Sequence, residues 1–176
     1  MKQMESNPVI KNILSRKSIR KYTDMPVSED QIRILLRAAM AAPSAVNLQS
    51  WAFIVVTDRL LLNTLSMKLP YAKMVASAPV AIVVCGDLSK ATYGGDYWVQ
   101  DCSAATQNIL LAAEALGLGA VWTSTYPEED RIITVKQILS LPEYIYPLNV
   151  IPIGYPNQEL TPKDKFDEEN IHYNMW

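Results

Sequence analysis

Hydrophobic residues recur at helical spacing in the first 40 residues of the chain. Between residues 8 and 15, Pro8 suits a first helical turn, and Val9, Ile10, Ile13 and Leu14 fall on one face. Ser28 and Gln31 have the spacing of a capping box and precede a strongly amphipathic pattern that ends before Pro43. The pattern therefore predicts one helix over 8–15 and a second that begins after Ser28.

Short apolar runs rich in β-branched residues predict four strands farther along the chain. "WAFIVVT" (51–57) and "PVAIVVCG" (79–86) are bounded by turn formers and predict buried strands separated by helical segments. "AVWTSTY" (120–126) and "YPLNVIPIGY" (146–155) predict two further strands that flank a helix near 128–140. Pro147 and Pro152 cannot donate to a β-ladder, so we expect the last strand to be irregular or to lie at a sheet edge.

The region from about 96 to 116 predicts a long buried helix, because it is rich in Ala and Leu and is followed by Gly117. Residues 156–176 instead combine two prolines, a run of charges and the aromatic ending "HYNMW". We expect this part to form an extended arm that could wrap a partner subunit. The 176 residues show no repeat or linker, so a single domain over 1–176 is expected.

Charge and composition narrow the possible functions. The chain has 16 basic and 18 acidic residues and a pI near 5.4, which gives no general attraction to nucleic acid, so any anion site must be local. The N-terminal residues lack the apolar core of a signal peptide, and no apolar run reaches the ~18 residues of a membrane span, so a cytoplasmic protein is expected. Cys85 and Cys102 are too few for a disulfide framework or a CxxC-type zinc site, and we expect no metal.

The first candidate for chemistry is "RKSIRKY" at residues 16–22. Arg16, Lys17, Arg20 and Lys21 place four positive charges around the Ser18 hydroxyl, without an acidic residue. Arginine forks, a hydroxyl and loop amides together suit a phosphate group. The alternative is a solvated basic turn, since cations are also favoured after the C-terminal end of a helix.

Two other stretches carry candidate binding residues. In "AAPSAVNLQSW" (41–51), Pro43 and Ser44 favour a tight turn, and Asn47 and Gln49 could hydrogen-bond to an amide-like ring edge. An ordinary helix-to-strand loop is the alternative. Near the C-terminus, Lys163 and Lys165 could complete an anion site or could simply be solvated beside neighbouring acidic residues, a surface arrangement that contributes little energy.

The order of these segments resembles that of the FMN-dependent nitroreductase family. The segments are "RKSIRKYTD", "APSAVNLQSW", "APVAIVVCGD", "GLGAVWTSTYP" and "VIPIGYP" with the charged end that follows, and the likeness runs from about residue 8 to the C-terminus. The resemblance implies an α+β fold in which a central mixed or antiparallel sheet is flanked by helices. It also implies an intertwined homodimer with exchanged C-terminal arms, and two FMN sites built from both subunits.

The resemblance also implies roles for individual residues. The FMN phosphate would be held by residues from both ends of the chain, namely Arg16, Lys17, Ser18, Lys163 and Lys165. Arg20 would lie near the pyrimidine end of the flavin, and Thr123 or Ser124 would face its reactive ring. The partner subunit would contribute Pro43, Ser44, Asn47 and Gln49; Ser50 stands where the family often has proline.

In such enzymes the flavin carries the chemistry, and no catalytic side chain is required. The implied reaction passes hydride from NADH or NADPH through FMN to a small aromatic, nitroaromatic or quinone-like acceptor, with ping-pong kinetics. Aromatic and apolar residues that could line the acceptor site, or equally the core or dimer interface, are Tyr71, Met74, Tyr97, Trp98 and Tyr126. A flavin carrier or redox sensor without nicotinamide-driven turnover is the alternative function.

Overall fold

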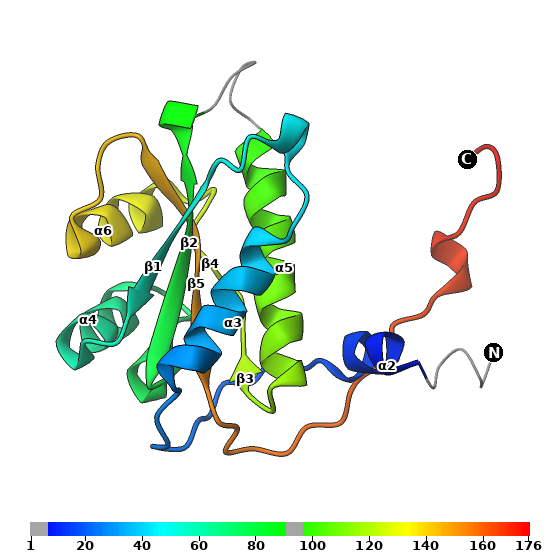
Figure 1. The fold of residues 1–176 in the computed structure, drawn as a ribbon, viewed down its shortest axis with the longest axis horizontal. Coiled ribbons are helices and arrows are strands. Elements are labelled where there is room, and N and C mark those ends of the chain that lie inside the picture. Colours follow the sequence, from blue (N-terminus) through cyan, green and yellow to red (C-terminus); the bar gives the residue numbers. More distant parts are fainter. Residues whose placement is uncertain (1–6, 91–96) are drawn as a thin grey trace.

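The computed structural model describes residues 7–90 and 97–176, which form an α+β fold around an antiparallel sheet (Figure 1). The three long strands are β1 (Trp51–Val56), β2 (Val80–Asp87) and β5 (Ile145–Gly154), in the order β1-β2-β5. Two short strands, β3 (Gly119–Ala120) and β4 (Thr123–Ser124), pair with the free side of β5. The α+β class with a central sheet and flanking helices is confirmed.

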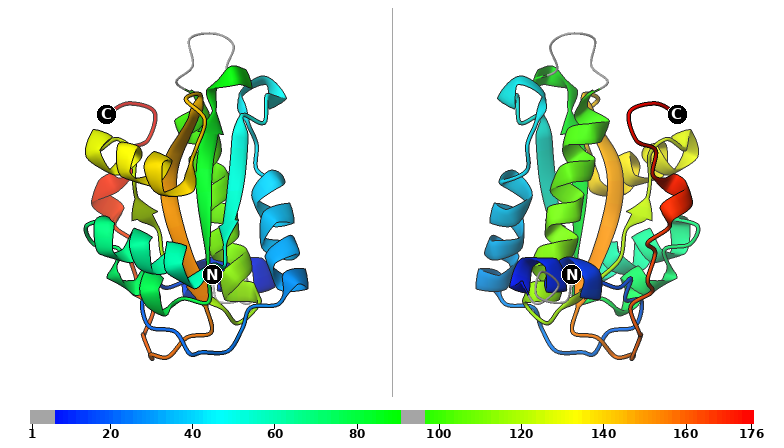
Figure 2. Two further views of the ribbon diagram at one scale, coloured as in Figure 1. Left: turned by 90° about the vertical axis from the view of Figure 1, so that its left-hand side faces the viewer. Right: turned by 90° about the vertical axis from the view of Figure 1, so that its right-hand side faces the viewer.

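Helices cover both faces of this sheet (Figure 2). Helices α3 (Glu29–Met40) and α5 (Tyr97–Ala115) cover one face, and α4 (Arg59–Lys68) and α6 (Glu129–Leu139) cover the other. The first face buries Leu35 and Ile109, and the second buries Leu62 and Val135. The remaining helical segments are α2 (Pro8–Ser15), η1 (Ala45–Asn47), η2 (Lys73–Ser77), η3 (Leu88–Lys90) and η4 (Glu168–Asn170).

The predicted helices form where their local signals place them. The Ser28 hydroxyl accepts from the Gln31 amide at 3.2 Å, and the Gln31 side chain accepts from the Ser28 amide at 3.0 Å, so the capping box of α3 is complete. Gly117 has φ +71°, a left-handed conformation that favours glycine and ends α5. Residue 96, the expected first residue of that helix, lies outside the described residues.

The last strand was expected to be irregular or to lie at a sheet edge; the irregularity is confirmed, and the edge position was wrong because β5 is central and pairs on both sides. A register shift between Val84 and Cys85 places Pro147 opposite Cys85 and leaves Leu148 as an extra residue, which accounts for the irregularity around the first proline. Pro152 lies in a break of the ladder between β3 and β4. Its carbonyl oxygen accepts from the Tyr22 hydroxyl at 3.2 Å.

The same break explains why 120–126 is not the single strand we expected. Ala120 lies opposite Ile153 and Thr123 lies opposite Val150, so the register is continuous across the break. The missing amide of Pro152 removes the hydrogen bond that Val121 would need there. Residues 121 and 122 are thereby released from the ladder.

Both ends of the described chain extend beyond the sheet on the side that α5 covers (Figure 1). Residues 159–176 are exposed, and large apolar side chains among them are solvent-facing: Phe166 is 71% exposed, Tyr173 84% and Trp176 101%. Among the described helices, none is long and apolar enough to cross a membrane.

Candidate functional site

The basic segment 16–22 is fixed to the body of the protein by two buried side chains. Ile19 is 2% exposed and Tyr22 6% exposed. The Ile19 amide donates to the Ala120 carbonyl at 3.1 Å, and the Tyr22 hydroxyl donates to the Ile19 carbonyl at 2.7 Å. Ser18 and Arg20, the neighbours of Ile19, line the cavities described below.

Close approach of this segment to β3 depends on Gly119. A Cβ atom at that position would lie 2.5 Å from Ile19 Cγ2 and 2.6 Å from Ile19 Cβ, well inside van der Waals contact. The glycine therefore allows Ile19 to pack directly on the strand. The placement of Ser18 and Arg20 depends on this packing.

The two ends of the chain meet in a cavity of about 380 Å³. Its lining contains five cationic residues and no carboxylate, and consists of Arg16, Lys17, Ser18, Arg20, Leu160, Thr161, Lys163 and Lys165. The structure thus brings the N-terminal cluster together with the C-terminal lysines. We refer to it as the cationic cavity.

Lys17 differs from the other cations of this cavity. Its Nζ atom lies 3.2 Å from the Glu114 carboxylate and donates to the Ser15 carbonyl at 2.9 Å. This ion pair commits much of the Lys17 charge to the protein itself. Arg16, Lys163 and Lys165 are the cations with most freedom to meet an anion.

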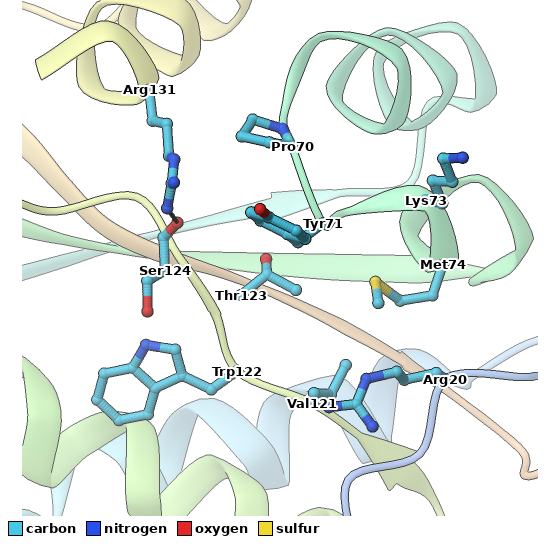
Figure 3. Close-up of a pocket in the computed structure, with 10 residues that line it drawn as sticks. All are labelled: Arg20, Pro70, Tyr71, Lys73, Met74, Val121, Trp122, Thr123, Ser124 and Arg131. Carbon is cyan, nitrogen blue, oxygen red and sulfur yellow. Dashed lines mark hydrogen bonds between the residues drawn. The ribbon is translucent and has the colours of Figure 1, made fainter. Parts of the chain in front are cut away.

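Figure 3 shows the lining of a larger cavity of about 760 Å³, which we call the ring cavity. Arg20 lines both cavities. The other lining residues are Pro70, Tyr71, Lys73, Met74, Val121, Trp122, Thr123, Ser124 and Arg131. The structure therefore gathers Arg20, Thr123 and Ser124 with two of the expected acceptor-site residues, Tyr71 and Met74.

The break in the ladder shapes one wall of the ring cavity, because Val121 and Trp122 both contribute to its lining. The Thr123 hydroxyl donates to the Val150 carbonyl at 2.6 Å, so it is committed to the sheet. Ser124 is exposed at the cavity. The segment 121–124 thus faces the cavity on one side and β5 on the other.

Sequence reasoning missed Lys73 and Arg131. Lys73 precedes Met74 and carries no distinguishing local pattern, and Arg131 follows three acidic residues in a run typical of a solvated helix start. In the structure Arg131 donates weakly from Nη1 to the Ser124 carbonyl, at 3.4 Å. Its Nε atom is buried and has no hydrogen-bond partner among the described residues.

The other aromatic candidates lie outside the ring cavity. Trp98 is 6% exposed within the core, where its indole packs over Gly86, and the Tyr126 ring meets it edge-on with 5.1 Å between centroids. Tyr97 begins α5 and is exposed. Trp98 thus has a packing role within this chain, while its role toward a ligand stays a prediction.

The loop 43–50 lies apart from both cavities, since none of Pro43, Ser44, Asn47 and Gln49 lines either one. The buried Asp101 carboxylate anchors this loop by accepting from the Ala45 amide at 2.9 Å and from the Ser50 hydroxyl at 3.2 Å.

Three non-glycine residues in the loop have left-handed backbones: Val46 at φ +46°, Asn47 at +57° and Gln49 at +52°. For a β-branched residue such as Val46 this conformation is strained, and it persists only where the surroundings enforce it. The loop is therefore a strained segment held by Asp101, and none of its candidate binding residues lines this chain's own two cavities.

The two cysteines have no role in the site. Both are buried and free, and burial raises the pKa of the Cys85 thiol to about 12, with Lys136 acting in the opposite direction. Burial also raises the pKa of Cys102. Both thiols are therefore neutral packing residues, as expected from their positions in apolar segments.

The chain is similar in sequence to a known protein family and to named relatives. The model of the nitroreductase family matches residues 13–66 and 58–155. A protein of Methanothermobacter thermautotrophicus, provisionally named an NADH dehydrogenase/NAD(P)H nitroreductase, is 50% identical over 168 residues, spanning 96% of this chain and 87% of that protein.

Two solved structures extend the likeness to the fold. A similarly named protein from Parabacteroides distasonis superposes with a TM-score of 0.94 at 53% identity, covering 97% of this chain and 100% of the other. A provisionally named nitroreductase from Desulfovibrio desulfuricans, solved in complex with FMN, gives a TM-score of 0.84 at 33% identity, with 97% and 99% covered.

Proposed function

The chain belongs to the nitroreductase family, and on this premise we propose that it is an FMN-dependent oxidoreductase that takes electrons from NADH or NADPH. The relatives' names support the oxidoreductase class and the nicotinamide donor, and the FMN complex of a structural neighbour supports the cofactor. Its acceptor is proposed to be a small aromatic, nitroaromatic or quinone-like molecule.

The observation that carries the proposal is the pair of cavities that share Arg20. A compact cationic cavity adjoins a larger one with apolar and aromatic walls. FMN has the matching polarity, with a doubly charged phosphate at one end and a flat ring at the other. The donor set of the cationic cavity, with arginine and lysine charges and a serine hydroxyl, suits a phosphate.

The match between FMN and the two cavities suggests a role for individual lining residues. Arg16, Ser18, Lys163 and Lys165 would bind the phosphate, while Arg20 would place positive charge beside the pyrimidine end of the ring. Thr123 and Ser124 would lie along the ring through the released segment 121–124. When bound, FMN supplies the hydride chemistry, and the protein supplies binding, orientation and charge.

A homodimer would complete the site. The loop 43–50 is anchored by Asp101 and contributes none of its candidate residues to its own chain's two cavities, as expected of a segment that serves the partner's site. The exposed Phe166, Tyr173 and Trp176 provide apolar surface for exchange of C-terminal arms. We propose that the arm and the loop both contact the second subunit.

A single ring cavity favours ping-pong kinetics, because donor and acceptor would occupy it in turn. For a nitro acceptor the reaction balances as one hydride and one proton taken up, with a nitroso product and water released. No side chain acts as a catalytic acid or nucleophile in this proposal.

FMN affinity of two alanine variants tests the phosphate assignment. Arg16→Ala removes a half-buried lining residue of the cationic cavity, whereas Lys21→Ala removes an exposed cation of the same cluster that lines neither described cavity. Loss of charge-assisted contacts of about 1.5–3 kcal/mol should weaken FMN binding roughly tenfold to a hundredfold in Arg16→Ala alone. Equal FMN affinity in both variants and the wild type would refute the assignment.

A further inference from the structure

Arg131 extends into the ring cavity from the first turn of α6, at the side opposite Arg20 and Lys73. In Figure 3, Tyr71 and Thr123 lie between Arg131 and that pair of cations. Arg20 and Lys73 already supply positive charge at their side of the cavity, and the cationic cavity lies beyond Arg20. The Arg131 charge is therefore separate from the cations assigned to FMN.

The guanidinium of Arg131 is poorly satisfied by the protein. Its hydrogen bond to the Ser124 carbonyl is long, at 3.4 Å, and its buried Nε has no partner among the described residues. The ion pairs between described residues are Lys17–Glu114 and Lys90–Asp87, so no described carboxylate forms a close ion pair with Arg131. A buried, unpaired donor on a charged group is costly and rare in folded proteins.

The surroundings define the ligand that would satisfy this group. No acidic residue lines the ring cavity, and an anion there would meet Arg131 without repulsion from the lining. Tyr71 and Met74 offer an aromatic and a polarizable wall for a flat ring. A planar guanidinium binds carboxylates through two parallel hydrogen bonds.

We propose that Arg131 is the specificity residue of the acceptor site and selects aromatic acceptors that carry a carboxylate over neutral acceptors of the same shape. The inference rests on the proposed function, because it places the acceptor against a flavin in the ring cavity. The 2′-phosphate of NADPH is a second source of negative charge. The ring cavity holds the reacting parts of the molecules, so the acceptor carboxylate is the group assigned to Arg131.

The test compares benzoate with benzamide, two probes of nearly equal shape that differ in charge. Their dissociation constants are measured by calorimetry on FMN-loaded protein at one fixed low salt concentration. Three variants are compared with the wild type. Arg131→Gln removes the positive charge, and Arg131→Lys keeps the charge but lacks the paired N–H donors of a guanidinium. Arg33→Gln is a matched control at an exposed arginine on α3.

The wild type and Arg33→Gln should bind benzoate about tenfold or more tightly than benzamide, the effect of one charge-assisted pair. Arg131→Gln should lose this preference, because its benzoate affinity falls to about that for benzamide, and Arg131→Lys should keep part of it. Equal affinity for both probes in the wild type, or a preference that persists in Arg131→Gln, overturns the inference.

Two further readings separate the possible failures. Anaerobic reduction rates with NADPH and NADH should have the same ratio in Arg131→Gln as in the wild type; a selective loss with NADPH would assign Arg131 to the donor phosphate and overturn the acceptor role. Flavin absorbance is recorded before any probe is added. Protein that loads FMN and is reduced, yet shows no benzoate preference, refutes this inference alone, whereas protein that takes up no FMN refutes the proposed function as well.

Discussion

Replacing Asp101 with alanine removes the anchor of the loop 43–50. The buried carboxylate accepts two hydrogen bonds, from the Ala45 amide at 2.9 Å and the Ser50 hydroxyl at 3.2 Å. Ser50 is 2% exposed, so its hydroxyl would be left buried without its partner. Hydrogen bonds to charged groups contribute about 1.5–3 kcal/mol each, so for the two bonds we expect a total loss of about 3–6 kcal/mol in the free energy of unfolding.

A loss of that size should lower the melting temperature by roughly 6–24 °C in a chain of this length. It should also weaken FMN binding, because the left-handed backbone at Val46, Asn47 and Gln49 would no longer be enforced. Asp101→Asn should recover most of both properties, since an amide can still accept from Ala45 and can donate to Ser50. Differential scanning calorimetry and an FMN fluorescence titration measure the two effects.

Asp24→Ala serves as the control, because Asp24 is an exposed aspartate whose side chain accepts no hydrogen bond from the residues that the structure describes. Its melting temperature and FMN affinity should match the wild type. The reasoning fails if Asp101→Ala melts and binds FMN as the wild type does. A fall in melting temperature with unchanged FMN affinity would show that the anchor stabilises the fold but does not position the loop for the flavin.

Three other changes have defined outcomes. Gly119→Ala places a methyl group 2.5 Å from Ile19 Cγ2, so chemical denaturation should show a loss of about 1–3 kcal/mol and equilibrium dialysis should show weaker FMN binding. Deleting residues 166–176 should convert a dimer into a monomer in light scattering; an unchanged mass would contradict arm exchange. The free energy of unfolding should fall as the pH rises above 9, the ordinary pKa of a thiol, because Cys85 and Cys102 ionise there only in the unfolded chain. The slope should reach about 1.4 kcal/mol per pH unit for each thiol. A flat profile between pH 9 and 11 would contradict the burial of the two thiols.

Local signals explain which elements could be predicted from the sequence. The capping box at Ser28 and Gln31 and the stop at Gly117 act within a few residues, so the start of α3 and, to within one residue, the end of α5 could be predicted. The position of β5 could not be found in this way. Its central place depends on β2 and β4 from distant parts of the chain, and Pro152 is tolerated because it lies in the break of the ladder between β3 and β4.

Some residues of the candidate site could likewise be predicted from the sequence, and others could be found only from the fold. The charges of Arg16 and Lys163 are visible in the sequence, but the docking that brings them together depends on Ile19 packing against Gly119. Arg131 was missed because acidic neighbours make it look solvated, whereas the fold turns its side chain into the ring cavity. The loop at Asn47 is expected to contact the flavin of a partner subunit, so its role cannot be seen in a single chain.

The most direct test of the central claim is an anaerobic titration of FMN-loaded protein with NADH and, separately, with NADPH, followed by the visible absorbance of oxidised flavin. The proposed function predicts rapid and stoichiometric bleaching by at least one donor, and reoxidation when a quinone or nitroaromatic acceptor is added. Bound flavin that neither donor bleaches would contradict the enzyme assignment and favour a flavin carrier or sensor.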